Sequence, residues 1–254
     1  MTMNKILKII YIKLIKTYKN NPYAFFTLIS GFALIFIIRS ILASLETIFI
    51  ADEYPFQRIL FMISSALLVI GIEIGYRKQI FLFLDKKSLK VSNIFNHFNL
   101  LGQYSIASII FIFTILIFSF LPTLLYVYNK LGVQFADIVN QSFNDPYFEN
   151  LISAYFNSND IIIMLLLCLI PSIYIWIRLF FWNYFIVDKN FTAIKSLKAS
   201  WQLTKGNEFN ILVLTILLFS INILGVLTIV GIFITPPISC LFISEYFRTI
   251  VNKQ

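Results

Sequence analysis

Three charged residues lie inside long apolar stretches, and they are the side chains best placed to do chemistry: Arg39, Glu73 and Arg178. A charge at the centre of a membrane-spanning helix costs about 2.5 to 3.5 kcal/mol, so each of these residues needs a partner. We expect Glu73 and Arg178 to form a salt bridge that ties two helices together, and Arg39 to approach Glu46 seven positions along the same helical face. A proton or substrate pathway through these residues is the alternative interpretation.

The sequence carries none of the common catalytic or metal-binding patterns. His97 is the only histidine, which excludes a two-histidine haem or zinc site and leaves a Ser-His-Asp triad a single candidate base. No phosphate-binding glycine loop, paired metal-ligand spacing or His-Glu-x-x-His motif occurs. We therefore expect a protein that is not an enzyme and that uses no metal and no cofactor, with His97 as a surface residue.

The composition is that of a membrane protein. Apolar residues make up 59% of the 254 residues and charged residues 13%, against about 45–50% and 25% in soluble domains. The net charge of +8 would suggest a nucleic acid partner in a soluble protein. Here the positive residues flank apolar stretches, so we expect anionic lipid headgroups as the partner, with another membrane protein as a further candidate, and no nucleic acid.

The apolar stretches predict an all-α bundle of six transmembrane helices, because a span needs about 20 apolar residues. The predicted spans cover about residues 24–45, 59–76, 104–128, 161–187, 210–226 and 229–248. With these spans, 16 of the 20 Lys and Arg residues fall on one side of the membrane and only Arg58 and Lys130 on the other. The positive-inside rule then places both termini in the cytoplasm.

The final apolar region, residues 211–243, is barely long enough for two crossings. Glycine and proline interrupt it, which favours a tight helical hairpin, while one span plus a re-entrant segment is the alternative. Over the whole chain, the residues expected to break or kink helices are Pro122, Pro171, Gly225, Gly231, Pro236 and Pro237.

Residues 1–21 form a separate element, predicted as a basic amphipathic helix that lies on the cytoplasmic leaflet, and residues 22–254 form the six-span domain. Lysines fall on one side of this helix and apolar residues on the other, a pattern typical of interfacial helices. A cleaved signal peptide is disfavoured, because lysines interrupt any apolar core and no small-residue cleavage site follows. Across the chain, the lysines expected to face headgroups or a partner are Lys5, Lys8, Lys13, Lys16, Lys86, Lys87, Lys90, Lys195, Lys198 and Lys205.

The two basic loops, between the second and third spans and between the fourth and fifth, look alike. The first runs from Asp85-Lys86-Lys87 through Ser92, an expected helix N-cap, to Gly102. The second runs from Asp188-Lys189-Asn190 through a short amphipathic helix to Gly206, offset by about 103 residues. A degenerate duplication and a pattern common to all such loops are both open interpretations.

The segment 129–160, predicted to lie outside the cell, is the longest polar stretch. Apolar residues recur in it at helical spacing, which predicts two short amphipathic helices on the outer membrane interface. A cap that binds a partner is the alternative.

Short motifs in residues 60–103 and 178–250 resemble a broad family of bacterial six-helix membrane proteins, similar to the membrane domain attached to some glycerophosphoryl diester phosphodiesterases. The motifs are Gly75-Tyr76-Arg77, Leu84-Asp85-Lys86-Lys87, Ser92-Asn93-Ile94-Phe95, Leu179-Phe180-Phe181, Ile186-Val187-Asp188, Ala193-Ile194-Lys195-Ser196-Leu197, Ser200-Trp201, Leu203-Thr204-Lys205-Gly206-Asn207, Gly225, Gly231, Pro236-Pro237 and Tyr246. The resemblance implies a six-span bundle in a bacterial inner membrane. It implies no phosphodiesterase activity, because the catalytic domain of those enzymes has no counterpart in this sequence.

Two functional hypotheses follow. The first is a non-catalytic scaffold or accessory subunit that organises lipids or another membrane complex through its basic helices and outer segment. The second is a small-molecule or lipid transporter that uses the space between helices near Glu73 and Arg178, with the broken final hairpin as its moving part.

Overall fold

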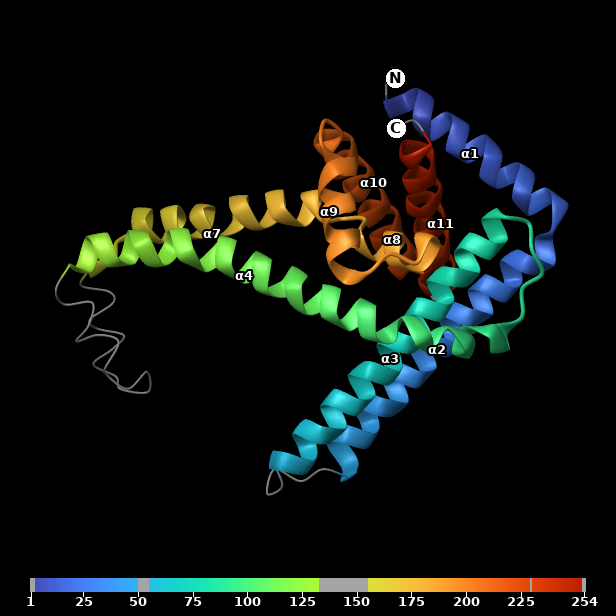
Figure 1. The fold of residues 1–254 in the computed structure, drawn as a ribbon, viewed down its shortest axis with the longest axis horizontal. Helices are drawn as coiled ribbons and strands as arrows, with labels where there is room; N and C mark the ends of the chain where they lie inside the picture. Colours follow the sequence, from blue (N-terminus) through green and yellow to red (C-terminus); the bar gives the residue numbers. More distant parts are fainter. Residues whose placement is uncertain (1–2, 50–54, 133–154, 229, 253–254) are drawn as a thin grey trace. The chain divides into compact units, whose positions relative to one another are not determined.

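The computed structural model describes residues 3–49, 55–132, 155–228 and 230–252. Within these ranges every regular element is helical, which confirms the all-α prediction (Figure 1). The elements are α1 (Met3–Asn20), α2 (Pro22–Phe49), α3 (Pro55–Leu84), the 3-10 helix η1 (Val91–Leu100), α4 (Leu101–Leu131), α7 (Ser158–Arg178), α8 (Trp182–Lys189), α9 (Ala193–Thr204), α10 (Glu208–Val226) and α11 (Gly231–Val251). The helices predicted for the outer segment fall mainly on residues 133–154, outside the described residues.

The chain divides into two compact units. Unit 1 contains residues 1–107 and 181–254, and unit 2 contains residues 108–180. Helix α1 belongs to unit 1, where it packs against α2, α3 and α11. The N-terminal helix therefore packs on the other helices of unit 1, and its predicted position on the cytoplasmic leaflet stays a prediction.

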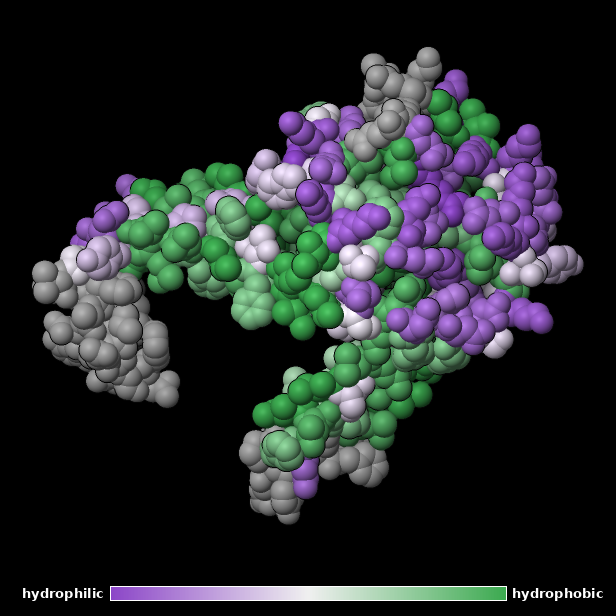
Figure 2. Space-filling view, viewed as in Figure 1, coloured by the Kyte–Doolittle hydropathy of each residue, from purple (hydrophilic) through white to green (hydrophobic). Residues whose placement is uncertain are grey.

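Five helical segments of the described chain are long and apolar enough to cross a membrane, and they identify a multi-pass membrane protein. They are Pro22–Thr47, Phe56–Leu84, Val91–Leu131, Ser158–Lys189 and Glu208–Val226. Large apolar side chains are widely exposed on them, as at Phe113 and Ile170. Figure 2 shows the far half of the α2–α3 hairpin as almost uniformly hydrophobic, while hydrophilic residues gather over the opposite end of unit 1. Helix α11, which covers the predicted sixth span, is not among these five segments.

Unit 2 is an antiparallel pair made of the larger part of α4 and α7, joined by polar contacts at two levels. The Ser119 and Ser172 hydroxyls share a hydrogen bond. Nearer the connecting segment, Asp160 pairs with Lys130 and accepts a hydrogen bond of 2.6 Å from the Tyr126 hydroxyl. Pro122 lies inside α4 and Pro171 inside α7, so neither proline ends its helix.

The fourth predicted span, 161–187, is interrupted in the structure. Helix α7 ends at Arg178, and α8 begins at Trp182. A serine of α9 stabilises this break, because the backbone N–H of Phe181 donates to the Ser200 hydroxyl at 3.0 Å. The predicted span is thus present as the apolar helical segment Ser158–Lys189, with a break that the sequence did not predict because it depends on a hydrogen bond to a residue nineteen positions away.

The expected helix of the first basic loop forms, but as a 3-10 helix that packs on other helices. Ser92 does not cap it, because the N-cap position is Lys90, and η1 runs directly into α4, so Gly102 does not stop it. Ile94 is completely buried. The sequence did not predict this close packing, which depends on Gly31 of α2 and Gly75 of α3.

The final hairpin forms as predicted, with α10 packed against α11. Its two glycines lie at the close approach: a Cβ on Gly225 would be 2.3 Å from the Thr235 hydroxyl, and one on Gly231 would be 2.3 Å from the Gly225 carbonyl oxygen. Pro236 and Pro237 lie within the continuous helix α11. The two prolines therefore do not end the helix, and the turn of the hairpin lies between Val226 and Gly231, close to the predicted boundary of 226 and 229.

The close approach of α3 to η1 at Gly75 yields a stability prediction. A Cβ added to Gly75 of α3 would lie 1.8 Å from the carbonyl oxygen of Ile94 in η1, a distance that requires the backbone to move. We expect Gly75→Ala to lower the free energy of unfolding by about 1 to 3 kcal/mol or more, as overpacking does. Thermal unfolding in mild detergent measures this.

Gly102→Ala is the matched control. Gly102 is also helical, but a Cβ there meets nothing within 4 Å. We expect this variant to be neutral or more stable by about 0.5 to 1 kcal/mol, because alanine loses less backbone entropy. Equal melting temperatures for the two variants would contradict the packing described for η1.

Candidate functional site

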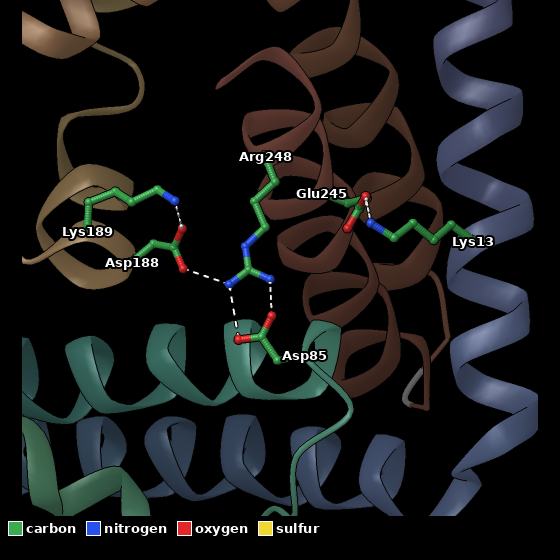
Figure 3. A network of polar contacts seen from close by, with 6 residues as sticks. All are labelled: Lys13, Asp85, Asp188, Lys189, Glu245 and Arg248. Carbon is green, nitrogen blue, oxygen red and sulfur yellow. Dashed lines mark hydrogen bonds and ion pairs between the residues drawn. The ribbon is translucent and has the colours of Figure 1, made fainter. Parts of the chain in front are cut away.

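Arg248 of α11 holds together the starts of the two basic loops (Figure 3). Its Nη1 lies 2.5 Å from Oδ1 of Asp85, and its Nη2 lies 3.3 Å from Oδ2 of the same carboxylate. Nη2 also lies 2.7 Å from Oδ1 of Asp188. We call Asp85, Asp188 and Arg248 the arginine clamp. One guanidinium thus joins α3, α8 and α11, using the planar donor geometry that suits carboxylates.

An aromatic cluster lies beneath the clamp. The Arg248 guanidinium carbon is 4.8 Å from the ring centroid of Phe81, within the range of a cation–π contact. Phe247 of α11 packs against Phe81, Phe181, Tyr184 and Phe185 with ring centroids 4.9 to 6.3 Å apart. Burial of this cluster excludes water from one side of the clamp and strengthens its charge pairing.

The two loops share a backbone geometry as well as an acidic residue. Helix α3 is followed by Lys86 with φ +58°, and α8 by Asn190 with φ +54°. In both cases the next residue donates its N–H back into the last turn, from Lys87 to the Leu82 carbonyl and from Phe191 to the Phe185 carbonyl. The first is a Schellman-type helix end, in which the N–H of Lys86 also donates to the Phe83 carbonyl; the second has the same left-handed residue, but the N–H of Phe191 reaches one residue further back. The resemblance of the loops predicted from sequence is thus present in the structure of their beginnings.

A second charged contact attaches α1 to the same end of unit 1. The Lys13 ammonium pairs with the Glu245 carboxylate, one turn before Arg248 on α11 (Figure 3). The Glu245 side chain is 3% exposed and that of Lys13 54%. A buried carboxylate is stable only when paired, so Lys13 holds α1 in place.

A lysine of α3 adds a further connection to α8. Lys78 donates to the backbone carbonyl of Val187 at 2.9 Å, at the end of α8 where helix carbonyls lack partners. Its neighbour Arg77 places its guanidinium carbon 5.6 Å from the ring centroid of Tyr184. The positive charges of α3 therefore support the position of α8 next to the clamp.

Comparison with known families identifies one match. A family model described as a domain of unknown function, DUF7847, matches residues 98–245. The chain belongs to this family. No curated protein and no solved structure matches the chain. The DUF7847 match includes Asp188 and Glu245, whereas Asp85 and Arg248 lie outside it. The resemblance to the phosphodiesterase membrane domain stays a prediction.

The intramembrane charges of this DUF7847 protein are paired differently from the expectation. Glu73 of α3 forms its ion pair with Arg39 of α2, and Glu46 pairs with Arg58 at 3.4 Å. The predicted Arg39–Glu46 pair was therefore wrong, because antiparallel packing of α2 and α3 brings each arginine to a carboxylate of the other helix. Arg178 belongs to unit 2, and its pairing with Glu73 stays a prediction.

The predicted headgroup-facing lysines are exposed wherever their side chains are described. They are Lys8, Lys13, Lys16, Lys86, Lys87, Lys90, Lys195, Lys198 and Lys205, whereas the side chain of Lys5 lies outside the described residues. On α9 the apolar residues Ile194 and Trp201 are also exposed, at 72% and 38%. The buried face of α9 combines small residues, such as Ser196 and Ser200, with Leu197 and Leu203. Helix α9 thus presents a mixed lysine and apolar face, which is typical of helices at a membrane interface.

Sequence reasoning missed Arg248 and Glu245 as site residues. They were counted as the inner end of a sixth span, although each is a charge in an otherwise apolar helix. One signal in the sequence could have indicated the clamp. Both loops begin with an aspartate, and two similarly placed aspartates can share one basic partner. The structure adds the site itself, because it brings together residues 85, 188 and 248, which are far apart in the chain.

Replacing the central arginine should cost more than removing one carboxylate. In Arg248→Leu, the Asp188 side chain, 7% exposed, keeps only Lys189 at 3.5 Å. We expect a loss of about 3 to 5 kcal/mol, as for a buried ion pair that loses one member. Asp85 is 37% exposed, and Asp85→Ala should cost about 1 kcal/mol or less.

Chemical denaturation in detergent measures both values, with Lys198→Leu as a control for the loss of an exposed charge. Equal costs for Arg248→Leu and Asp85→Ala would contradict the burial of the Asp188–Arg248 pair.

The Lys13–Glu245 pair predicts a local effect on α1. In Lys13→Ala the Glu245 carboxylate stays buried without its counter-charge, so α1 should detach from α11 more often. We expect faster backbone hydrogen exchange across residues 8–18, measured by mass spectrometry. Lys16→Ala, which removes an exposed lysine of the same helix, should leave the exchange unchanged. Identical exchange in the two variants would show that this pair does not hold α1.

Proposed function

We propose that this protein is a non-catalytic six-span protein of the bacterial cytoplasmic membrane, acting as a scaffold or accessory subunit that organises anionic lipids or another membrane complex. In this proposal α11 is the sixth crossing, both termini are cytoplasmic, and the arginine clamp lies at the cytoplasmic end of the bundle. Five candidate spans and the long α11 support the topology. An excess of Lys and Arg on one side supports the orientation.

The observation that carries the proposal is the arrangement of lysines around the clamp. Three acidic side chains at this end, Asp85, Asp188 and Glu245, are each engaged by a basic partner. Lys86 and Lys87 of the first loop and the lysines of α9 are exposed beside them. With these three acids paired to basic residues, the exposed lysines give the surface net positive charge, which suits an anionic headgroup layer.

A rigid attachment favours a scaffold over a moving part. The clamp, the buried aromatic cluster and the Lys13–Glu245 pair all fix the helices at this end of unit 1. A transporter needs helices that exchange partners between two states. The proposed role instead uses a constant basic surface to gather lipids or to seat a partner.

The transporter alternative has one observation in its favour. A cavity of about 310 Å³ lies between α2 and α3 and is lined by Arg39, Glu46 and Met62, among others. It is near the Arg39–Glu73 pair, which ties the same two helices. Solute flux in proteoliposomes that disappears in Glu73→Gln would favour transport over the scaffold role.

The proposal predicts local enrichment of anionic lipid around the protein. The full chain would be placed in liposomes of phosphatidylcholine with a minor fraction of fluorescent phosphatidylglycerol, and energy transfer from the native tryptophans would report the lipid nearby. Replacing Lys86, Lys87, Lys195 and Lys198 by glutamine should reduce the transfer to the level seen with fluorescent phosphatidylcholine. Transfer that is equal for the two lipids in the unmodified protein would contradict a lipid-organising role.

The proposed orientation in the membrane is tested separately, in intact cells that produce the protein. Cysteines at Lys87 and Lys198 should react with membrane-permeant maleimides and resist impermeant ones. Labelling of either position from outside would overturn the proposed topology.

A further inference from the structure

An apolar groove lies between α1 and the end of the bundle in unit 1. One part, about 270 Å³, is lined by Tyr11, Leu14, Phe25, Phe83 and Leu241, among others. A second part, about 340 Å³, is lined by Leu217, Ile221, Tyr11 and Phe242 and continues it along α10. The two parts share Tyr11 and Phe242, so they adjoin at these two rings, and we call them together the apolar groove.

A basic pocket adjoins the groove at the α3 end. It measures about 150 Å³ and is lined by Thr17, Asn20, Asn21, Lys86 and Lys87, among others. Phe83 lines both this pocket and the groove. The apolar groove thus meets a set of amide and ammonium donors at the ring of Phe83.

The positive charge of this pocket is available for a ligand. Arg248 donates two hydrogen bonds to the carboxylate of Asp85, the acidic residue next to Lys86 and Lys87. Among the ion pairs of the described residues, none involves Lys86 or Lys87. The backbone turn at Lys86, with φ +58°, directs the chain so that both lysines line the pocket.

Charge complementarity selects the ligand. The groove is apolar along its length and basic at the α3 end, where it meets donors that bind phosphate oxygens. Its two parts together have the size of sites that hold small amphiphilic molecules. In a membrane protein the molecule with this pattern is a lipid with apolar chains and an anionic phosphate.

We propose that unit 1 binds one anionic glycerophospholipid specifically. An acyl chain of this lipid lies in the groove beneath α1, and its phosphate lies in the pocket of Lys86 and Lys87. Helix α1, attached through Lys13 and Glu245, forms the wall that separates this lipid from the surrounding bilayer. The inference rests on the proposed membrane role and goes beyond it, because it assigns a single stoichiometric site instead of a diffuse basic surface.

Native mass spectrometry of the full chain in detergent tests this site. Phosphatidylglycerol should bind with one molecule per chain and at least about tenfold more tightly than phosphatidylcholine. The double variant Lys86→Gln/Lys87→Gln should weaken phosphatidylglycerol binding about 30-fold, the effect expected of two lysines close to an anionic group. The control Lys195→Gln/Lys198→Gln removes the same charge from α9 and should leave this affinity unchanged.

A second pair of variants tests the groove separately from the charge. Ile238 lines the groove, and Ile238→Trp should weaken binding of both lipids because the larger ring fills the space. Ile232→Trp, on the same helix but not lining the groove, should bind as the unmodified protein does. Circular dichroism and size-exclusion chromatography confirm that each variant is folded, so a loss confined to the groove and pocket variants supports the site.

Three results would overturn the inference. Equal weakening by the two lysine double variants would indicate diffuse attraction. Competition by glycerophosphoglycerol, which has the headgroup and no chains, as strong as that of the lipid would indicate an anion pocket only. A lipid-free dimer as the main species would assign the groove to a second copy. In the first case the enrichment of anionic lipid in liposomes would persist, so the inference can fail while the proposed function stands.

Discussion

The interaction on which unit 1 depends is the shared attachment of two aspartates to one arginine. Arg248 reaches Asp85 at the end of α3 and Asp188 in α8, and it lies above the ring of Phe81. These elements come from three distant parts of the chain. A guanidinium can hold two carboxylates because its donors are planar and its charge is permanent. Without it, two acids would lie close together beside an aromatic core.

The clamp also determines what the surface of this end can bind. Engaging Asp85 leaves Lys86 and Lys87 as the charged groups at the start of the first loop. The same helix α11 carries Glu245, which attaches α1, and α1 then forms one wall of the apolar groove. Internal pairing of acids thus produces both an external basic surface and a sheltered apolar space. This connection is the geometric basis of the lipid binding that we propose.

The sequence predicted what depends on composition and on periodicity within a segment. The helical class, the final hairpin and the exposure of the lysines follow from long apolar stretches and from the cost of burying charge. It did not predict contacts between segments. The packing of Ile94 on Gly75 and the hydrogen bond from Phe181 to Ser200 depend on which helices are neighbours. The same applies to Arg248, whose two partners could be suspected only from the similarity of the loops.

The most direct test of this account is the coupling free energy between Asp85 and Asp188, measured by a double-mutant cycle of aspartate to asparagine changes. The two residues share Arg248, so their effects on the unfolding free energy should be non-additive by at least about 0.5 kcal/mol. In the Arg248→Leu background the coupling should fall to zero or become the repulsion of two carboxylates. Additive effects in the unmodified protein, unchanged when Arg248 is replaced, would contradict the clamp as the organising contact of this protein.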